Sequence, residues 1–189
     1  MAIEQEKIVS NIKKYFDTAN KIGFMTDKLA ELLGEEFMKA PASHMADYHN
    51  SFEGGLVDYL LTTTKYAVLI NKSLPDDEKV DHNSLVKVCL LHQIGKAHLY
   101  KPCESEWHRK NQGKNYEFTN NLASIRVGER SVYYALSNGV TLTEDEYNAI
   151  LNYSKVEDKM SEYHNSMVGE LLKMGSTLAI KHLQKLHNK

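Results

Sequence analysis

Two histidines and a lysine are the residues of this chain best suited to chemistry, because each adjoins an apolar segment. His92 follows two leucines in a long apolar run, and Lys96 comes four residues later. His49 precedes a second such run, which begins at Gly54. An imidazole can bind a metal ion or transfer a proton, and a lysine can supply charge to a phosphate. A histidine in a buried helix is more often a hydrogen-bonded core residue, so these positions need support from the rest of the sequence.

The sequence lacks the short motifs that mark several common enzyme classes. It has no glycine-rich phosphate-binding loop, no nucleophile elbow and no HExxH zinc motif. Its two cysteines stand in different settings, Cys89 in an apolar run and Cys103 after a proline, and no CxxC pair exists. Neither a structural disulfide nor a cysteine zinc site is therefore expected.

Charge and hydropathy are those of a balanced globular chain. The 23 lysines and arginines are offset by 25 aspartates and glutamates, and the net charge of -2 gives no overall attraction to nucleic acid or to an anionic membrane. The first residues do not form a basic segment followed by an apolar one, and no apolar run approaches about 18 residues. We expect a cytoplasmic protein with no membrane partner and with no nucleic-acid partner.

Helical periodicity dominates the sequence and predicts a mainly α fold. Only three prolines occur, and the stretches between them carry apolar residues at helical spacing. A length of 189 residues suits one domain, in which N-terminal helices over 1–39 pack on a helical core over 40–189. The predicted helices span 3–19, 27 to before Pro41, 54–71, 83–96, 128–137, 143–151 and 161–186.

The helical period fails between 98 and 121, where the sequence predicts a small β-hairpin near 104–119. The polar stretch 111–114 is typical of a turn, with strands expected on either side of it between 107 and 118. Basic residues gather there beside an aromatic ring, namely Trp107, His108, Arg109, Lys110 and Lys114. Such a cluster is as a rule a solvated turn, although it could also serve as a docking element.

Three segments, taken in order, resemble the HD-domain phosphohydrolases. The first, 40–59, contains Gly54, Gly55 and Leu56 followed by an acidic residue, as at the start of the first core helix of that family. The second, 86–97, resembles the helix that carries the His-Asp pair after which the family is named. The third, 128–150, is similar to the downstream helices that supply further metal ligands. The resemblance covers roughly 40–179 and implies a helical bundle built around a metal site.

The metal-ligand positions that this resemblance implies have almost all changed. Only His92 is retained, while the other ligand positions are occupied by Tyr59, Gln93, Val127, Tyr153 and, near the end, Ser176. A neutral amide cannot bridge two cations as a carboxylate does, and a phenol with a pKa near 10 is a poor neutral ligand. A single imidazole without carboxylates does not hold a hard divalent cation. We therefore expect no catalytic metal, no cofactor and no catalytic residues.

What remains around the former metal site is a set of polar and aromatic side chains. The predicted ligand pocket consists of His49, Tyr59, His92, Gln93, Lys96, Glu129, Arg130 and Tyr153. Lys96 and Arg130 would bring charge to a phosphate, and tyrosine rings could stack on a base. The same side chains could equally have refilled and closed the core after the metal was lost. The sequence thus predicts an inactive HD-type protein that binds a nucleotide-like ligand or a partner protein.

Two alternatives stay open at this point. A divergent metal-dependent phosphohydrolase acting on a nucleotide or phosphoester would need an atypical metal centre, built from His44, His49, His92, Asp47 and Asp58. A homodimer could instead form through an apolar stripe of the last helix, composed of Met167, Leu171, Met174 and Leu178. Such a stripe is more often ordinary core.

Overall fold

The computed structural model describes residues 5–120, 122–153 and 166–187. Within them the fold is mainly α, as predicted. The helices are α1 (Gln5–Lys21), α2 (Asp27–Lys39), α3 (Gly55–Ser73), α4 (His82–Leu91), the short 3₁₀ helix η1 (Ile94–Lys96), α5 (Glu106–Gln112), α6 (Val127–Ser137), α7 (Glu144–Asn152) and α8 (Met167–His187). The strands are β1 (Tyr100–Pro102) and β2 (Tyr116–Phe118). The stretch 161–165, where the last helix was predicted to begin, lies outside the described residues.

Several helices begin at the polar residues that the sequence singles out. Thr26 caps α2, because its Oγ1 accepts the backbone N–H of Leu29 at 3.0 Å. At the start of α7, Thr143 Oγ1 accepts the N–H of Glu146 at 3.2 Å, and the Glu146 carboxylate accepts the N–H of Thr143 at 3.0 Å. These bonds satisfy backbone donors that have no partner inside the helix. The predicted capping box of α7 is therefore confirmed.

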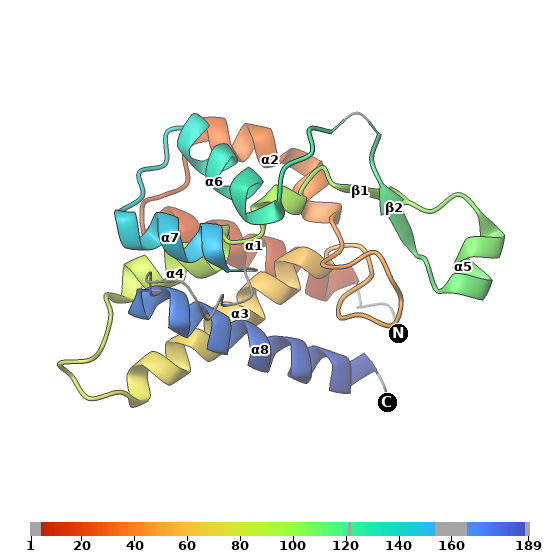
Figure 1. Cartoon of the computed structure of the whole chain (residues 1–189). Coiled ribbons are helices and arrows are strands. Elements are labelled where there is room, and N and C mark those ends of the chain that lie inside the picture. Colours follow the sequence, from red (N-terminus) through yellow and green to blue (C-terminus); the bar gives the residue numbers. More distant parts are fainter. Residues whose placement is uncertain (1–4, 121, 154–165, 188–189) are drawn as a thin grey trace, which may run out of the picture.

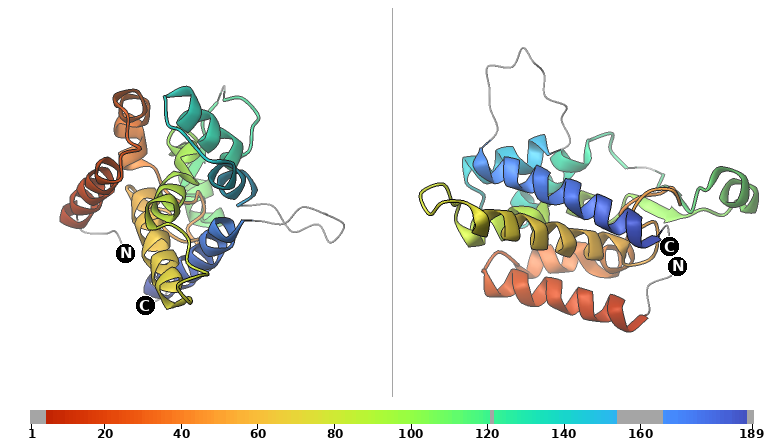
Figure 2. Two further views of the ribbon diagram at one scale, coloured as in Figure 1. Left: turned by 90° about the vertical axis from the view of Figure 1, so that its left-hand side faces the viewer. Right: turned by 90° about the horizontal axis from the view of Figure 1, so that it is seen from below.

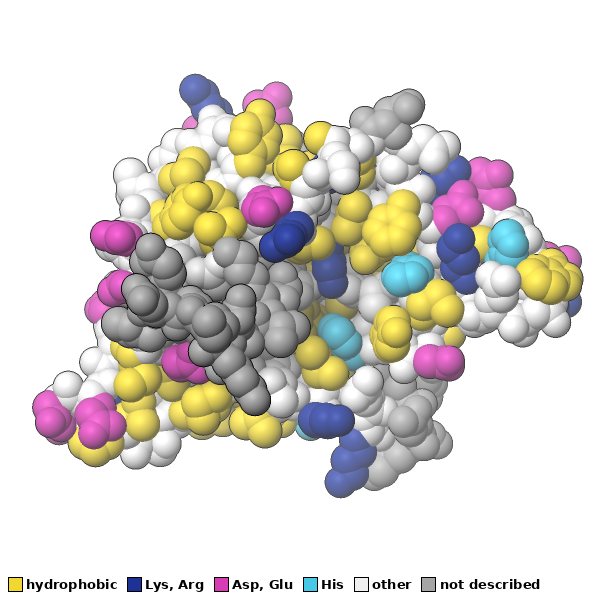
Figure 3. Space-filling model, viewed as in Figure 1, with side chains coloured by type: hydrophobic (Ala, Val, Ile, Leu, Met, Phe, Trp, Pro, Cys, Tyr) yellow, Lys and Arg dark blue, Asp and Glu magenta, His cyan; other side chains and the backbone are white. Residues whose placement is uncertain are grey.

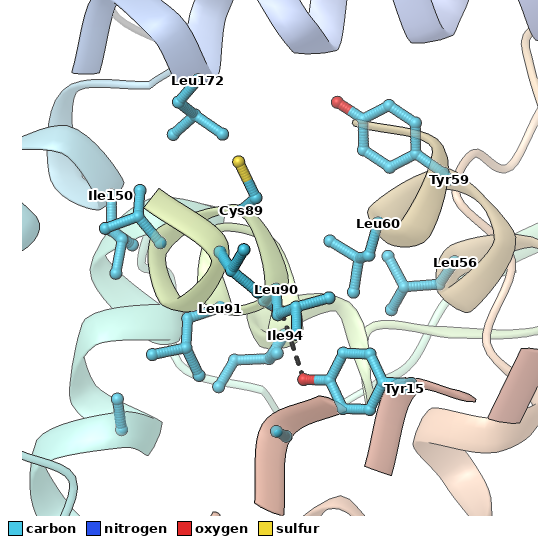
Figure 4. Packing of buried hydrophobic residues seen from close by; sticks show 14 of the residues in the cluster. Tyr15, Leu56, Tyr59, Leu60, Cys89, Leu90, Leu91, Ile94, Ile150 and Leu172 are labelled. Atoms are coloured by element: carbon cyan, nitrogen blue, oxygen red, sulfur yellow. Dashed lines mark hydrogen bonds between the residues drawn. The ribbon is translucent and has the colours of Figure 1, made fainter. Parts of the chain in front are cut away.

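Helix α4 runs through the middle of the core. Figure 1 shows α3 and α8 side by side along one face, and Figure 2 shows α1 and α2 on the opposite side of α3 from α8. Side chains from α1, α3, α7 and α8 surround α4 in Figure 4. The α3 and α8 backbones meet at Gly175, where a Cβ atom would lie 2.8 Å from the backbone nitrogen of Ala67. None of the described helices is long and apolar enough to cross a bilayer.

The predicted helix over 83–96 is wrong at its C-terminal end, because α4 stops at Leu91. Gln93 leaves the helical conformation, with φ of -129° and ψ of 19°, and η1 follows it. Side chains take over the carbonyls that this early end exposes. The carbonyl of Cys89 lies 2.8 Å from Nδ1 of His92, and that of Leu90 accepts the hydroxyl of Tyr15 at 3.1 Å. Apolar periodicity continues across the break, so the sequence pattern could not reveal it.

After α4 the backbone passes very close to α6. A Cβ atom on Gly95 would lie 2.6 Å from the carbonyl oxygen of Val127, so only glycine allows this approach. The N–H of Gly95 donates to Ser131 Oγ at 2.9 Å, and this hydroxyl is also 3.1 Å from the carbonyl oxygen of His92. The turn after α4 is thus held by α6, which fixes His92, Gln93 and Lys96 relative to the bundle.

A small antiparallel hairpin is present, and its second strand, β2, lies within the predicted range, whereas its first strand, β1, comes before the predicted one. Tyr100 pairs with Phe118 and Pro102 with Tyr116. The segment predicted as the first strand is instead helix α5, which Ser105 caps by accepting the N–H of His108 at 3.2 Å. The helix ends at Gly113, whose φ of 62° is left-handed. Figure 1 shows this hairpin and α5 projecting away from the helices.

Candidate functional site

Three hydroxyl groups from distant parts of the chain meet in the interior. The hydroxyl of Tyr59, on α3, lies 2.7 Å from that of Tyr153, at the end of α7, and 2.7 Å from Ser176 Oγ, on α8. Tyr153 and Ser176 are themselves 2.7 Å apart. All three stand at positions where the family resemblance places metal ligands. The bundle therefore brings these three positions together, and their side chains form one hydrogen-bonded cluster.

His92, the position at which the resemblance predicts a retained histidine ligand, lies beside this hydroxyl cluster. Its ring centroid is 4.6 Å from that of Tyr153, and its Nε2 is 3.4 Å from the Tyr59 hydroxyl. A carbonyl can only accept, so the contact with Cys89 places the ring proton on Nδ1 and leaves Nε2 as an acceptor for Tyr59. Burial is the main reason that the pKa of His92 falls to about 3; the hydrogen bond to Cys89 opposes this fall, and the nearby charge of Lys96 adds to it. The ring is therefore neutral at physiological pH.

The donor set of this cluster does not suit a divalent metal. Burial, and then the neighbouring Tyr153, raise the pKa of Tyr59 well above its ordinary value, so its phenol stays protonated. In the described part of the chain, no group of three or more histidine, cysteine or acidic side chains is placed to hold a metal ion. The alternative centre based on His44, His49 and His92 is therefore not assembled there.

Asp58, the acidic residue that follows the two glycines, faces α1 and the loop before α3. Its Oδ1 accepts from Asn11 Nδ2 at 2.9 Å, and its Oδ2 accepts from Asn50 Nδ2 at 2.9 Å. The ammonium group of Lys7 lies 3.7 Å from the same carboxylate. This carboxylate thus fastens α1 to α3, which is a structural role.

Lys96 carries a charge into a partly buried position, where none of the described carboxylates balances it. Its Nζ donates to the carbonyl oxygen of Ala42, in the loop before α3. No acidic side chain of the described residues pairs with it. Burial alone lowers the pKa of Lys96 to about 8, so the amine is still mostly charged at neutral pH. Of the groups near the hydroxyl cluster, this ammonium group would attract an anion most strongly.

The remaining predicted pocket residues divide into two groups. The His49 ring packs on Tyr59, with centroids 4.7 Å apart, and so joins the cluster. Gln93 is buried next to His92, and its Oε1 has no hydrogen-bond partner among the described residues. Arg130 and Glu129 instead serve the start of α6, where Arg130 Nη2 donates to the carbonyl of Ala123 at 2.6 Å and Glu129 accepts the N–H of Arg126 at 2.9 Å.

Two basic side chains near Lys96 have other predicted roles. The sequence predicts His44 only as a ligand of an alternative metal centre, and Lys114 only as part of a basic turn. An isolated bridge between Met45 and Lys114 brings these distant segments together. Burial, and then the charges of Lys114 and Lys96, lower the pKa of His44. No local sequence signal announces a pairing across this distance, so the cationic group could not be predicted.

Figure 3 shows histidine and basic side chains around a recess in the middle of one face, between the helices and the projecting hairpin. This arrangement suits a small anionic ligand, because several cationic or neutral donors face one region.

Comparison with known proteins adds no assignment: no family model, curated protein or solved structure matches this chain. The family resemblance therefore stays a prediction, and only the contacts of the site bear on function.

Proposed function

We propose that this chain is an HD-type helical protein that has lost catalytic metal binding and acts by holding a phosphate-bearing, nucleotide-like ligand on Lys96. The observation that carries the proposal is the charge of this lysine, which no carboxylate in the described ranges compensates. An ammonium group taken out of water loses hydration, and a single carbonyl restores only part of it. A phosphate would supply both the missing charge and a charge-assisted hydrogen bond.

The arrangement of the hydroxyl cluster supports the HD-type part of the proposal. Four positions that the resemblance treats as metal ligands belong to four separate segments, yet their side chains form a connected set of contacts. Such convergence is expected if the helices keep the family's arrangement while the ligands have been replaced. Since the replacements are neutral and bonded to one another, they favour binding without hydrolysis.

Calorimetric titration tests the ligand-binding part. We expect nucleoside mono- and triphosphates to bind the wild-type protein, and Lys96→Met to weaken that binding by about 10- to 100-fold, the usual loss for a hydrogen bond to a charged group. Lys72→Met is the matched control, because Lys72 is exposed in the last turn of α3. Equal affinities for wild type and Lys96→Met, or no heat with any nucleotide at millimolar concentration, would show that the proposal is wrong.

Product analysis tests the absence of hydrolysis. The protein, purified without chelators, is incubated with each bound nucleotide in the presence and absence of manganese. We expect no release of phosphate or nucleoside, and less than about a tenth of an equivalent of bound transition metal. Manganese-stimulated turnover that follows the protein through purification would instead establish the divergent phosphohydrolase.

A further inference from the structure

The loop before α3 and the hairpin form a joint that lies next to Lys96. The N–H of Tyr116 donates to the carbonyl of His44 at 3.1 Å, and the N–H of Ala46 donates to the carbonyl of Gly113 at 2.6 Å. Lys96 holds the same loop through the carbonyl of Ala42. The hairpin is therefore attached to the wall of the recess, although Figure 1 shows its far end extending away from the bundle.

Four rings gather at this joint and form what we call the aromatic ledge, defined as His44, Tyr48, Tyr100 and Phe118. His44 stacks on Tyr100 with centroids 5.8 Å apart and an interplanar angle of 23°. Phe118 lies 5.4 Å from His44 and 5.3 Å from Tyr100, while Tyr48 is 6.5 Å from His44.

The outer rings of the ledge remain open to solvent. Tyr48 is 56% exposed and Phe118 is 54% exposed. Large exposed rings at a joint between two segments are not needed to hold it, because the backbone hydrogen bonds already do so. They do provide flat apolar faces, on which a planar heterocycle can stack.

Two lysines, Lys96 and Lys114, contact the loop that carries His44. His44 is only two residues from Ala42, the partner of Lys96, and Lys114 is bridged to Met45. The influence of Lys96 and Lys114 on the pKa of His44 agrees with this proximity. A nucleotide needs a flat ring on which its base can stack and a cation that binds its phosphate, and both kinds of group lie together here.

We infer that the aromatic ledge stacks the base of a mononucleotide whose phosphate lies on Lys96. This inference depends on the proposed function and names its ligand class. A mononucleotide is favoured over a nucleic-acid strand because the ledge offers few rings and the chain has a net charge of -2. A strand would require a longer track of cations.

The test compares ligands with and without a base. Dissociation constants are measured for adenosine and guanosine mono- and triphosphates, for ribose 5-phosphate and for inorganic pyrophosphate. We expect the wild-type protein to bind at least one nucleotide about tenfold more tightly than the base-free ligands, in keeping with the usual strength of a base stacked on a ring. The double variant Tyr48→Ala/Phe118→Ala should lose that preference but still bind pyrophosphate.

Two controls separate stacking from a general effect on the hairpin. Trp107→Ala removes another ring, 60% exposed on α5, which lies outside the ledge and should leave nucleotide affinity unchanged. Phe118→Tyr keeps the ring and should keep the preference. Melting curves check that every variant folds, as expected for exposed side chains.

Each outcome supports or overturns a separate step. If the wild-type protein binds pyrophosphate and nucleotides equally, the ledge inference is wrong while the phosphate site stands. If no phosphate compound binds, both proposals fail. A short single-stranded oligonucleotide that binds more than about tenfold better than every mononucleotide would overturn the mononucleotide assignment.

Discussion

Removing the Tyr59 hydroxyl tests whether the hydroxyl cluster holds the core together. Tyr59→Phe keeps the ring but deletes an oxygen that contacts Tyr153 and Ser176, each at 2.7 Å, and His92 at 3.4 Å. Tyr153 and Ser176 can still bond to each other. The Nε2 atom of His92 is left buried without its donor, because the other ring nitrogen already serves Cys89.

The magnitude follows from the bonds lost. A net contribution of about 0.5–1.5 kcal/mol for each hydrogen bond, with a further penalty for the stranded Nε2, gives a loss of about 2–3 kcal/mol in the free energy of unfolding. Tyr15→Phe is the matched control, since this tyrosine is equally buried and makes one hydroxyl bond, to Leu90 at 3.1 Å. Its loss should be only about 1 kcal/mol.

Urea unfolding followed by circular dichroism measures both variants under the same conditions. For a chain of this length the Tyr59→Phe loss also corresponds to a fall in Tm of roughly 4–12 °C. If Tyr59→Phe costs no more than Tyr15→Phe, the three hydroxyls do not stabilise the interior as a unit. The assignment of these side chains as a closed replacement for the metal site would then be wrong.

Three other perturbations test separate features of the structure. Burial lowers the pKa of Lys96 from 10.5 to about 8, so between these pH values the folded protein binds fewer protons than the unfolded one. The stability of the wild-type protein should therefore rise with pH across that window, relative to that of Lys96→Met. Lys96→Met should be the more stable protein at pH 7, although it loses the ligand, and paired urea titrations at pH 7 and 10 check both statements. Gly95→Ala forces a Cβ to 2.6 Å from the Val127 carbonyl and should lower stability by about 3 kcal/mol or more, measured by thermal unfolding. Leu171→Asp should unfold the protein because Leu171 is 1% exposed, whereas Leu178→Asp, at a position 46% exposed, should leave circular dichroism unchanged.

The last comparison also bears on the apolar stripe considered for dimerisation. Leu171 belongs to the core, so only Met167, Met174 and Leu178 of that stripe face outward. A variant at Leu171 cannot separate assembly from folding. Light scattering on Leu178→Asp can, because its fold should be intact.

The features predicted correctly from the sequence are those set by neighbouring residues. Thr26 and Thr143 cap helices through hydrogen bonds to the backbone N–H three residues later, and α2 ends just before Pro41. Local chemistry of this kind is visible in the sequence because both partners lie within one turn. The small hairpin was predicted only in part, since the connection between its strands contains a short helix, α5, which Ser105 caps.

Features that depend on distant residues could not be predicted in the same way. The end of α4 is stabilised by Tyr15 and Ser131, which lie far from it in the chain. The contact among Tyr59, Tyr153 and Ser176 could be anticipated only from the family resemblance, because nothing in the neighbouring sequence links these residues. The helix bounds were predicted mainly from the spacing of apolar residues. Tertiary contacts that replace a helix's own hydrogen bonds do not change that spacing, so it cannot reveal them.

The closed hydroxyl cluster and Lys96, which has no carboxylate partner in the part of the chain that the structure describes, together determine where a ligand can lie. Since Tyr59, Tyr153 and Ser176 are bonded to one another, their hydroxyls are already engaged, so a phosphate is directed to the Lys96 side. There it competes with the carbonyl of Ala42 for the ammonium group. Release of that carbonyl would loosen the loop to which His44 and the hairpin are bonded. Binding of phosphate at Lys96 and stacking at the ledge should then be coupled, and a base-free phosphate should change hydrogen exchange at Tyr116 even though it does not contact the rings.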